Sequence, residues 1–214
     1  MLIDPHVNPY DAEPDELIDA LIDASLDGAL ISCTHSARDA LPYLKALEEE
    51  DFVGFVGVEL LTPHGALVFV PREANEAFFK APWHPSKEQA EQVSLGAEGA
   101  SLSVWSLEAL QERLKGEQGV TFVVHPFSRL ASRAWGDRVY TLTDVSAVET
   151  RVGRGLAVRD FLCDQVAEQK GWARLGSCGG DLSILGSAAT ALLDSVETQD
   201  ASCDALERGV CWPV

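Results

Sequence analysis

Four of the five histidines in this chain stand beside short apolar runs that predict β-strands. His6 follows the first apolar residues, and three more end or follow later runs, namely His35, His64 and His125. Carboxylates occupy comparable places, with Glu59 at a predicted strand end and Asp181 after a glycine pair. Because the carboxyl ends of parallel strands gather at one end of a sheet or barrel, we expect these six side chains to meet. Imidazoles combined with carboxylates suit zinc, manganese or iron, so the pattern predicts a divalent metal site.

The opening stretch "IDPHVN" (3–8) places His6 and Asn8 two residues apart. On a strand, residues at this spacing point to the same face. Two histidines there would suggest a metal site, but the second position carries an amide. The stretch alone allows three interpretations: a metal site that has lost a ligand, a weakened metal site, or a strand with two polar residues.

The elements around these residues alternate between strands and helices. Short runs rich in β-branched residues predict buried parallel strands at 29–34, 55–60, 65–70, 120–125 and 146–150. Amphipathic periodicity predicts helices at 15–26, 106–116 and 157–171, with Pro14 at a first helical position and Ser106 as a cap. This order is typical of an α/β fold with a parallel sheet.

One irregular stretch, residues 71–101, is rich in proline, glycine and charge. We interpret it as a lid or a surface excursion near a site, packed down by Phe78, Phe79 and Trp83. The chain shows no linker or internal repeat, and its 214 residues suit one domain spanning 1–214.

Composition limits the partners that this chain can take. A net charge of −18 repels a phosphate backbone, so we expect no nucleic-acid partner. No apolar run is long enough to span a bilayer and no secretory signal is present, which favours a cytoplasmic protein with no membrane association. The five cysteines contain no CxxC pair, so we expect reduced, partly buried thiols and no disulfide framework.

The order of these motifs resembles that of the polymerase and histidinol phosphatase (PHP) family from end to end. The family opens with a strand ending in Asp-x-His-x-His, continues to Thr-Asp-His, Gly-x-Glu and His-Pro motifs, and then has a strand with a glutamate and Gly-Ser-Asp-x-His. The matching stretches here are "DPHVN" (4–8), "LDGALISCTHS" (26–36), "GVEL" (57–60), "VVHPFSR" (123–129), "SAVET" (146–150) and "GGDLS" (179–183).

The resemblance implies a distorted (β/α)7 barrel of seven parallel strands and a metal-dependent phosphoesterase or a polymerase domain. It also implies which residues hold metal. His6, Asn8, Glu59 and Asp181 fall at the positions of the first ion. Glu59, His64 and His125 fall at those of the second, and His35 at one position of the third.

Three positions depart from the family pattern: Asn8 replaces a histidine, Thr34 an aspartate and Ser183 a histidine. "IDPHVN" therefore resembles an eroded metal site, and we expect one or two divalent ions. An amide oxygen is a weaker ligand that suits hard cations such as manganese. A thiolate of Cys33 or Cys178 is an alternative soft ligand, although small buried cysteines are commoner.

Two functions from different classes fit this sequence. The first is a metal-dependent hydrolase of a small phosphate ester, in which an ion lowers the pKa of a water. Arg129, shortly after His125, then binds the phosphate, or is equally a surface ion-pair partner. The second is a PHP-like domain with little or no catalysis, kept for binding or assembly with a protein partner.

Overall fold

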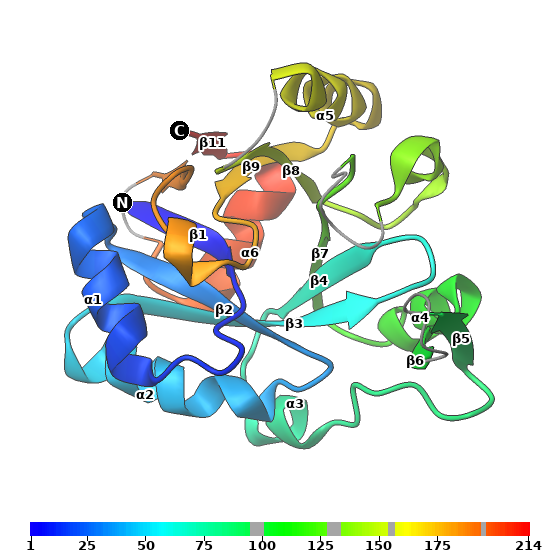
Figure 1. The fold of residues 1–214 in the computed structure, drawn as a ribbon, viewed down its shortest axis with the longest axis horizontal. Helices are drawn as coiled ribbons and strands as arrows, with labels where there is room; N and C mark the ends of the chain where they lie inside the picture. Colours follow the sequence, from blue (N-terminus) through cyan, green and yellow to red (C-terminus); the bar gives the residue numbers. More distant parts are fainter. Residues whose placement is uncertain (95–100, 128–133, 154–156, 194–195) are drawn as a thin grey trace.

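In the computed structural model, the protein forms a curved sheet of nine strands that nearly closes into a barrel (Figure 1). The structure describes residues 1–94, 101–127, 134–153, 157–193 and 196–214. Along the sheet the order is β11-β10-β1-β2-β3-β4-β7-β8-β9. Its strands are β1 (Leu2–Val7), β2 (Gly28–Thr34), β3 (Val53–Leu61), β4 (Ala66–Pro71), β7 (Gly119–Val124), β8 (Ala147–Val152), β9 (Ala173–Ser177), β10 (Thr190–Leu192) and β11 (Cys211–Pro213).

The sheet is mixed and not wholly parallel. Parallel pairing joins β1, β2 and β3, and again β7, β8 and β9. Strand β4 runs antiparallel to both of its neighbours, so the prediction of a parallel strand at 65–70 is wrong. The cause is the short connection at 62–65, because a parallel crossover needs about a dozen residues or more, whereas a hairpin does not.

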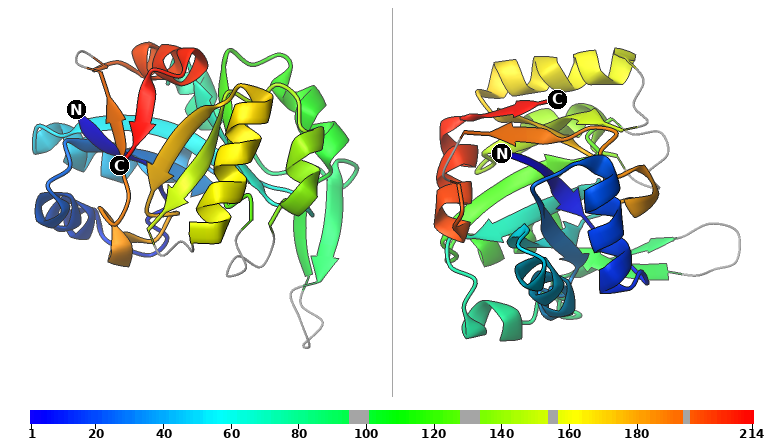
Figure 2. Two further views of the ribbon diagram at one scale, coloured as in Figure 1. Left: turned by 90° about the horizontal axis from the view of Figure 1, so that it is seen from above. Right: turned by 90° about the vertical axis from the view of Figure 1, so that its left-hand side faces the viewer.

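The two ends of the sheet meet along a seam where β9 lies against β10 and β11. The Thr190 hydroxyl accepts a hydrogen bond from the Gly176 N–H at 3.0 Å and donates one to the Gly176 carbonyl at 2.9 Å. A side chain at Gly176 would place its Cβ 2.3 Å from the Ala189 carbonyl oxygen, so glycine permits this close approach. Figure 2 shows β1, β9, β10 and β11 gathered on one side of the molecule.

Helices pack around the sheet, most of them on its outer face and α6 against its inner face. They are α1 (Pro14–Ala24), α2 (Leu41–Glu49), α3 (Glu76–Lys80), α4 (Leu107–Leu114), α5 (Ala157–Lys170) and α6 (Gln199–Arg208), with short 3-10 turns at Arg38–Ala40, Gly136–Thr141 and Leu182–Ile184. The three predicted helices are confirmed as α1, α4 and α5, and the Ser106 side chain caps α4 by accepting the Ala109 N–H. No helix in the described ranges has both the length and the apolar character to cross a bilayer.

The stretch at 71–101 is more regular than predicted. It contains α3 and the strand β5 (Ala90–Ser94), which pairs with β6 (Ser101–Trp105) in a separate hairpin. Phe78 and Trp83 are buried, and Phe79 packs partly against the same core, as expected from the sequence.

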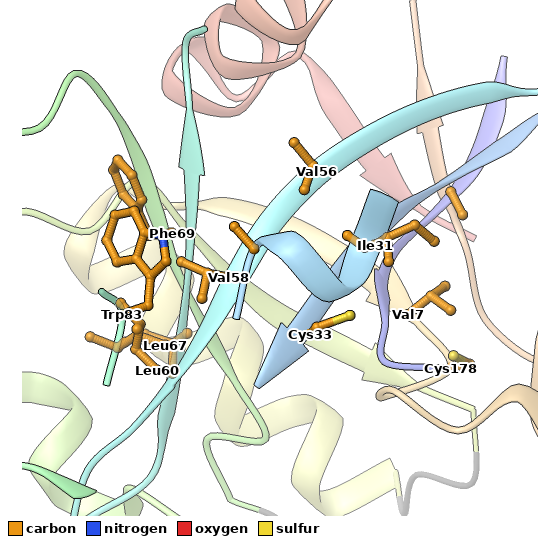
Figure 3. Close-up of a cluster of buried hydrophobic side chains, with 14 of the residues drawn as sticks. Val7, Ile31, Cys33, Val56, Val58, Leu60, Leu67, Phe69, Trp83 and Cys178 are labelled. Carbon is orange, nitrogen blue, oxygen red and sulfur yellow. The ribbon is translucent and has the colours of Figure 1, made fainter. Parts of the chain in front are cut away.

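Alternate residues of each strand face two different cores. Val56, Val58 and Leu60 of β3 pack toward the outer helices, in the cluster that Figure 3 shows. Phe55 faces the inside of the curved sheet, where α6 also packs. Because side chains alternate along a strand, Glu59 of β3 shares the inner face with Phe55.

Helix α6 closes the end of the barrel opposite the functional residues. The Gln199 side chain bonds both the N–H and the carbonyl of Val56. The Cys203 thiol lies 3.5 Å from the carbonyl oxygen of Pro71, which pairs with Gly119 at the amino end of β7. The inner-face acids near the carboxyl ends of the strands are therefore left at the other, open end.

The seam yields a first prediction. Thr190→Val keeps the side-chain volume but leaves the buried N–H and carbonyl of Gly176 without their partner, which should lower the free energy of unfolding by about 1–3 kcal/mol. Urea unfolding measures the change, with Thr143→Val as a matched exposed control. Equal stability of Thr190→Val and the wild type would show that the seam does not depend on this hydroxyl.

Candidate functional site

The first functional strand, β1, is tied to the loop that follows β9. The Asp4 carboxylate accepts the His6 N–H at 3.0 Å and the Cys178 N–H at 2.7 Å. The Gly180 N–H in turn donates to the His6 carbonyl at 3.0 Å. The pairing of β1 with β2 is irregular between Asp4 and Val7, around His6. These bonds fix His6 inside β1.

Glu149 on β8 is a buried carboxylate that lies against both His6 and His125. These three residues are called the hub below. One of the Glu149 oxygens, Oε1, lies 2.7 Å from His6 Nδ1 and accepts the Ser177 hydroxyl at 2.5 Å. The other, Oε2, accepts the backbone N–H of His125 at 2.7 Å and lies 3.6 Å from His125 Nδ1. The Glu149 side chain is wholly buried, so its charge depends on these partners.

The electrostatics of this hub follow from burial and pairing. Burial alone would raise the pKa of Glu149, but His6 and His125 nearby hold that pKa well below its usual range. Burial lowers the pKa of His6, and the neighbouring Glu149 carboxylate outweighs this and raises it. Glu149 is therefore a permanent anion between two imidazoles.

His125 and His35 follow β7 and β2 in an uncommon backbone conformation. Their φ angles are +50° and +56°, in the left-handed region that non-glycine residues seldom adopt. Each such residue costs about 1–3 kcal/mol and persists only where its surroundings impose the conformation. Here, the Glu149 side chain holds the His125 N–H, and the Glu59 carbonyl accepts the His35 N–H at 2.9 Å.

The residues at the hub fit a divalent ion. His6, His125 and Glu149 each offer a ligand atom within 4.8 Å of the others, which makes them the one such group in the described part of the chain. The Nε2 atom of His6 is buried and has no hydrogen-bond partner. Because Glu149 already accepts several hydrogen bonds, we assign it as the carboxylate that orients His6 through Nδ1 and leaves Nε2 free for a metal.

Next to the hub lies a second polar group, formed by Asn8, Thr34 and Glu59. The Asn8 amide nitrogen donates to Thr34 Oγ1 at 2.8 Å and to Glu59 Oε2 at 2.9 Å. The Thr34 hydroxyl donates to the same Glu59 oxygen at 3.0 Å. Asn8 and Thr34, which differ from the PHP pattern, thus bind Glu59, which matches that pattern.

Both groups border a cavity of about 1080 Å³ at the open end of the barrel. Its lining includes Asn8, Thr34, Glu59 and His125, together with a pair of imidazoles, His35 and His84. The rings of this pair lie 5.3 Å apart. Burial, followed by the proximity of His84, lowers the pKa of His35 to about 4, so His35 is neutral at pH 7.

Two further predicted residues, His64 and Asp181, are not among the described residues that line the cavity. His64 sits in the turn between β3 and β4, hydrogen-bonded to Arg138. Asp181 is exposed, and its carboxylate accepts the Ser183 N–H at 2.9 Å and the Ser183 hydroxyl at 2.7 Å. Arg129 lies outside the described residues.

The thiol alternative finds no support in the site. All five cysteines are unpaired and buried. Burial raises the pKa of Cys33 to about 12 and raises that of Cys178 further, which disfavours a thiolate at either position.

Sequence reasoning gave no role to Glu149, Asp4 or Ser177. Glu149 carried the same signal as Glu59, an acid within a predicted strand, and it stood in a motif already matched to the family. The position of His84 beside His35 had no sequence signal, because it depends on how Trp83 anchors the excursion in the core.

Comparison with known proteins supports the fold. No protein-family profile matches the sequence, and no curated protein matches it. A solved structure from Bifidobacterium adolescentis, assigned as a metal-dependent phosphoesterase, is similar with a TM-score of 0.63 and 13% identity, covering 97% of this chain and 96% of that one. An amidohydrolase from Chromobacterium violaceum, solved with sulfate and without metal, has a TM-score of 0.56 and 12% identity, covering 80% and 84%. The chain therefore shares the fold of these two structures.

The hub gives a second prediction. Glu149→Gln keeps the size of the side chain but removes its charge, so His6 loses the anion that orients it. Affinity for zinc should fall by about 10- to 100-fold, as measured by competition with a chromogenic chelator. Glu112→Gln, which removes an exposed acid on α4, is the control and should leave the affinity unchanged. Unaltered zinc affinity in Glu149→Gln would contradict the assigned role.

Proposed function

We propose that this chain is a divergent PHP-type, metal-dependent hydrolase of a small phosphate ester, and that its mixed sheet is a variant of the (β/α)7 barrel. One observation carries the proposal: His6, His125 and Glu149 come together beside a cavity large enough for a small ester. The likeness to a structure assigned as a metal-dependent phosphoesterase supports the same class. We further propose a cytoplasmic protein without a nucleic-acid partner.

In this proposal, the residues of the site have different roles. The His6 and His125 imidazoles hold the ion, which is zinc, manganese or iron, and Glu149 sets their direction. When bound, such an ion supplies Lewis acidity to a phosphoryl oxygen and lowers the pKa of a water. Because the chain carries a net charge of −18, a cation bound by His6 and His125 would favour an anionic substrate only locally. Arg129 remains our proposal for a phosphate-binding residue.

A specific observation favours a second candidate function. Glu59, which the resemblance assigns as the ligand shared by two ions, accepts hydrogen bonds from Asn8 and Thr34 at one of its oxygens, Oε2. A two-ion mechanism requires a clamp on both the attacking and the leaving oxygen. If the chain holds only one ion, it fits a binding or assembly module with little turnover.

A panel of phosphomonoesters and small phosphodiesters, assayed with added manganese or zinc, tests the proposal. We expect metal-dependent turnover in the wild type and a loss of at least about 100-fold in kcat/KM in both His6→Ala and His125→Ala, since each removes a ligand. Circular dichroism of each variant checks the fold, and removal and return of the metal checks the dependence.

The other outcomes distinguish the alternatives. Metal binding without turnover on any ester favours the module. A loss of activity in His64→Ala as large as that in His125→Ala would support the ligand set implied by the family resemblance. Full activity in His6→Ala would refute the site.

A further inference from the structure

Hydrogen bonds join Asn8, Thr34 and Glu59 to one another at a position where the family resemblance implies an ion. The two amide hydrogens of Asn8 are both used, one on Thr34 and one on Glu59. The single hydroxyl hydrogen of Thr34 is also used on Glu59. Asn8 is 3% exposed and Glu59 is 6% exposed, so these bonds lie largely out of water. Bonds from neutral donors to a carboxylate in such surroundings are strong.

The orientation of the Asn8 amide decides what this group can bind. The Asn8 oxygen accepts the Tyr10 N–H at 3.4 Å. Exchanging the oxygen and nitrogen of the amide would turn two donors toward each other at Tyr10. It would also place the amide oxygen against the Glu59 carboxylate. Asn8 therefore presents N–H groups to Glu59, and an amide N–H offers no lone pair to a cation.

We propose that the Asn8 amide replaces a metal ion beside Glu59: its N–H groups, with the Thr34 hydroxyl, hold the Glu59 carboxylate where a cation would otherwise be needed. Asn8 and Thr34 are then a matched pair of changes, because each supplies one hydrogen bond to the same oxygen of Glu59. The chain consequently holds a single ion at His6 and His125. The count of one ion depends on the proposed function, whereas the role of the amide does not.

The test is Asn8→Asp, which replaces the donors with a second carboxylate facing Glu59. Without divalent ions, the repulsion should lower Tm by roughly 5–10 °C. Millimolar manganese should restore Tm, and a manganese titration should show one more bound equivalent than in the wild type. Asn8→Ala is the matched control, because it removes the donors and adds no carboxylate. Its Tm should fall, and manganese should not restore it beyond the effect on the wild type.

Glu59→Gln covers the case in which Asn8→Asp does not fold. We expect it to bind as many equivalents of metal as the wild type with a lower Tm, because Glu59 holds hydrogen bonds and not an ion. Loss of one metal equivalent in Glu59→Gln or in Asn8→Ala would overturn the proposal and make these residues ligands. If the wild type binds no metal, the single-ion function fails, while recovery of Asn8→Asp by manganese would still support the role of the amide.

Discussion

The buried Glu149 carboxylate is the interaction on which the rest of the site depends. It lies on β8 and binds His6 from β1, Ser177 at the end of β9, and the residue that follows β7, His125. A buried anion is tolerated only when its oxygens are fully bonded, so the carboxyl ends of four strands must converge on it. His6 and His125 thus lie close together because both bind the buried charge of Glu149.

The same end of the barrel contains the strained backbone. His125 and His35 adopt left-handed conformations directly after their strands, and each is held by a hydrogen bond from its own N–H to a neighbouring strand. The opposite end is closed by α6 and apolar side chains. Apolar packing thus closes one end of the barrel, and the strained, polar residues lie at the open end beside the cavity.

Periodicity predicted the strands β2, β3, β7 and β8 and the helices α1, α4 and α5, because such elements bury their apolar residues at spacings that a sequence reveals directly. The direction of β4 was missed, although the short connection at 62–65, with its proline and glycine, contains the hairpin signal. Partner choice was harder to predict. Asn8 and Glu59 meet as expected, but the hydrogen bonds between them depend on side-chain orientation, which spacing does not encode. His64 and Asp181 stand in places that a motif suggests, yet a turn and an exposed loop direct them elsewhere.

Anomalous diffraction from crystals grown with zinc or manganese tests the central claim most directly, because it locates the ion independently of activity. The account predicts one strong peak at about 2.0–2.2 Å from a nitrogen of His6 and a nitrogen of His125, with Glu149 hydrogen-bonded to His6. A peak bridging Asn8 and Glu59, or no peak near His6 in protein saturated with metal, would contradict it.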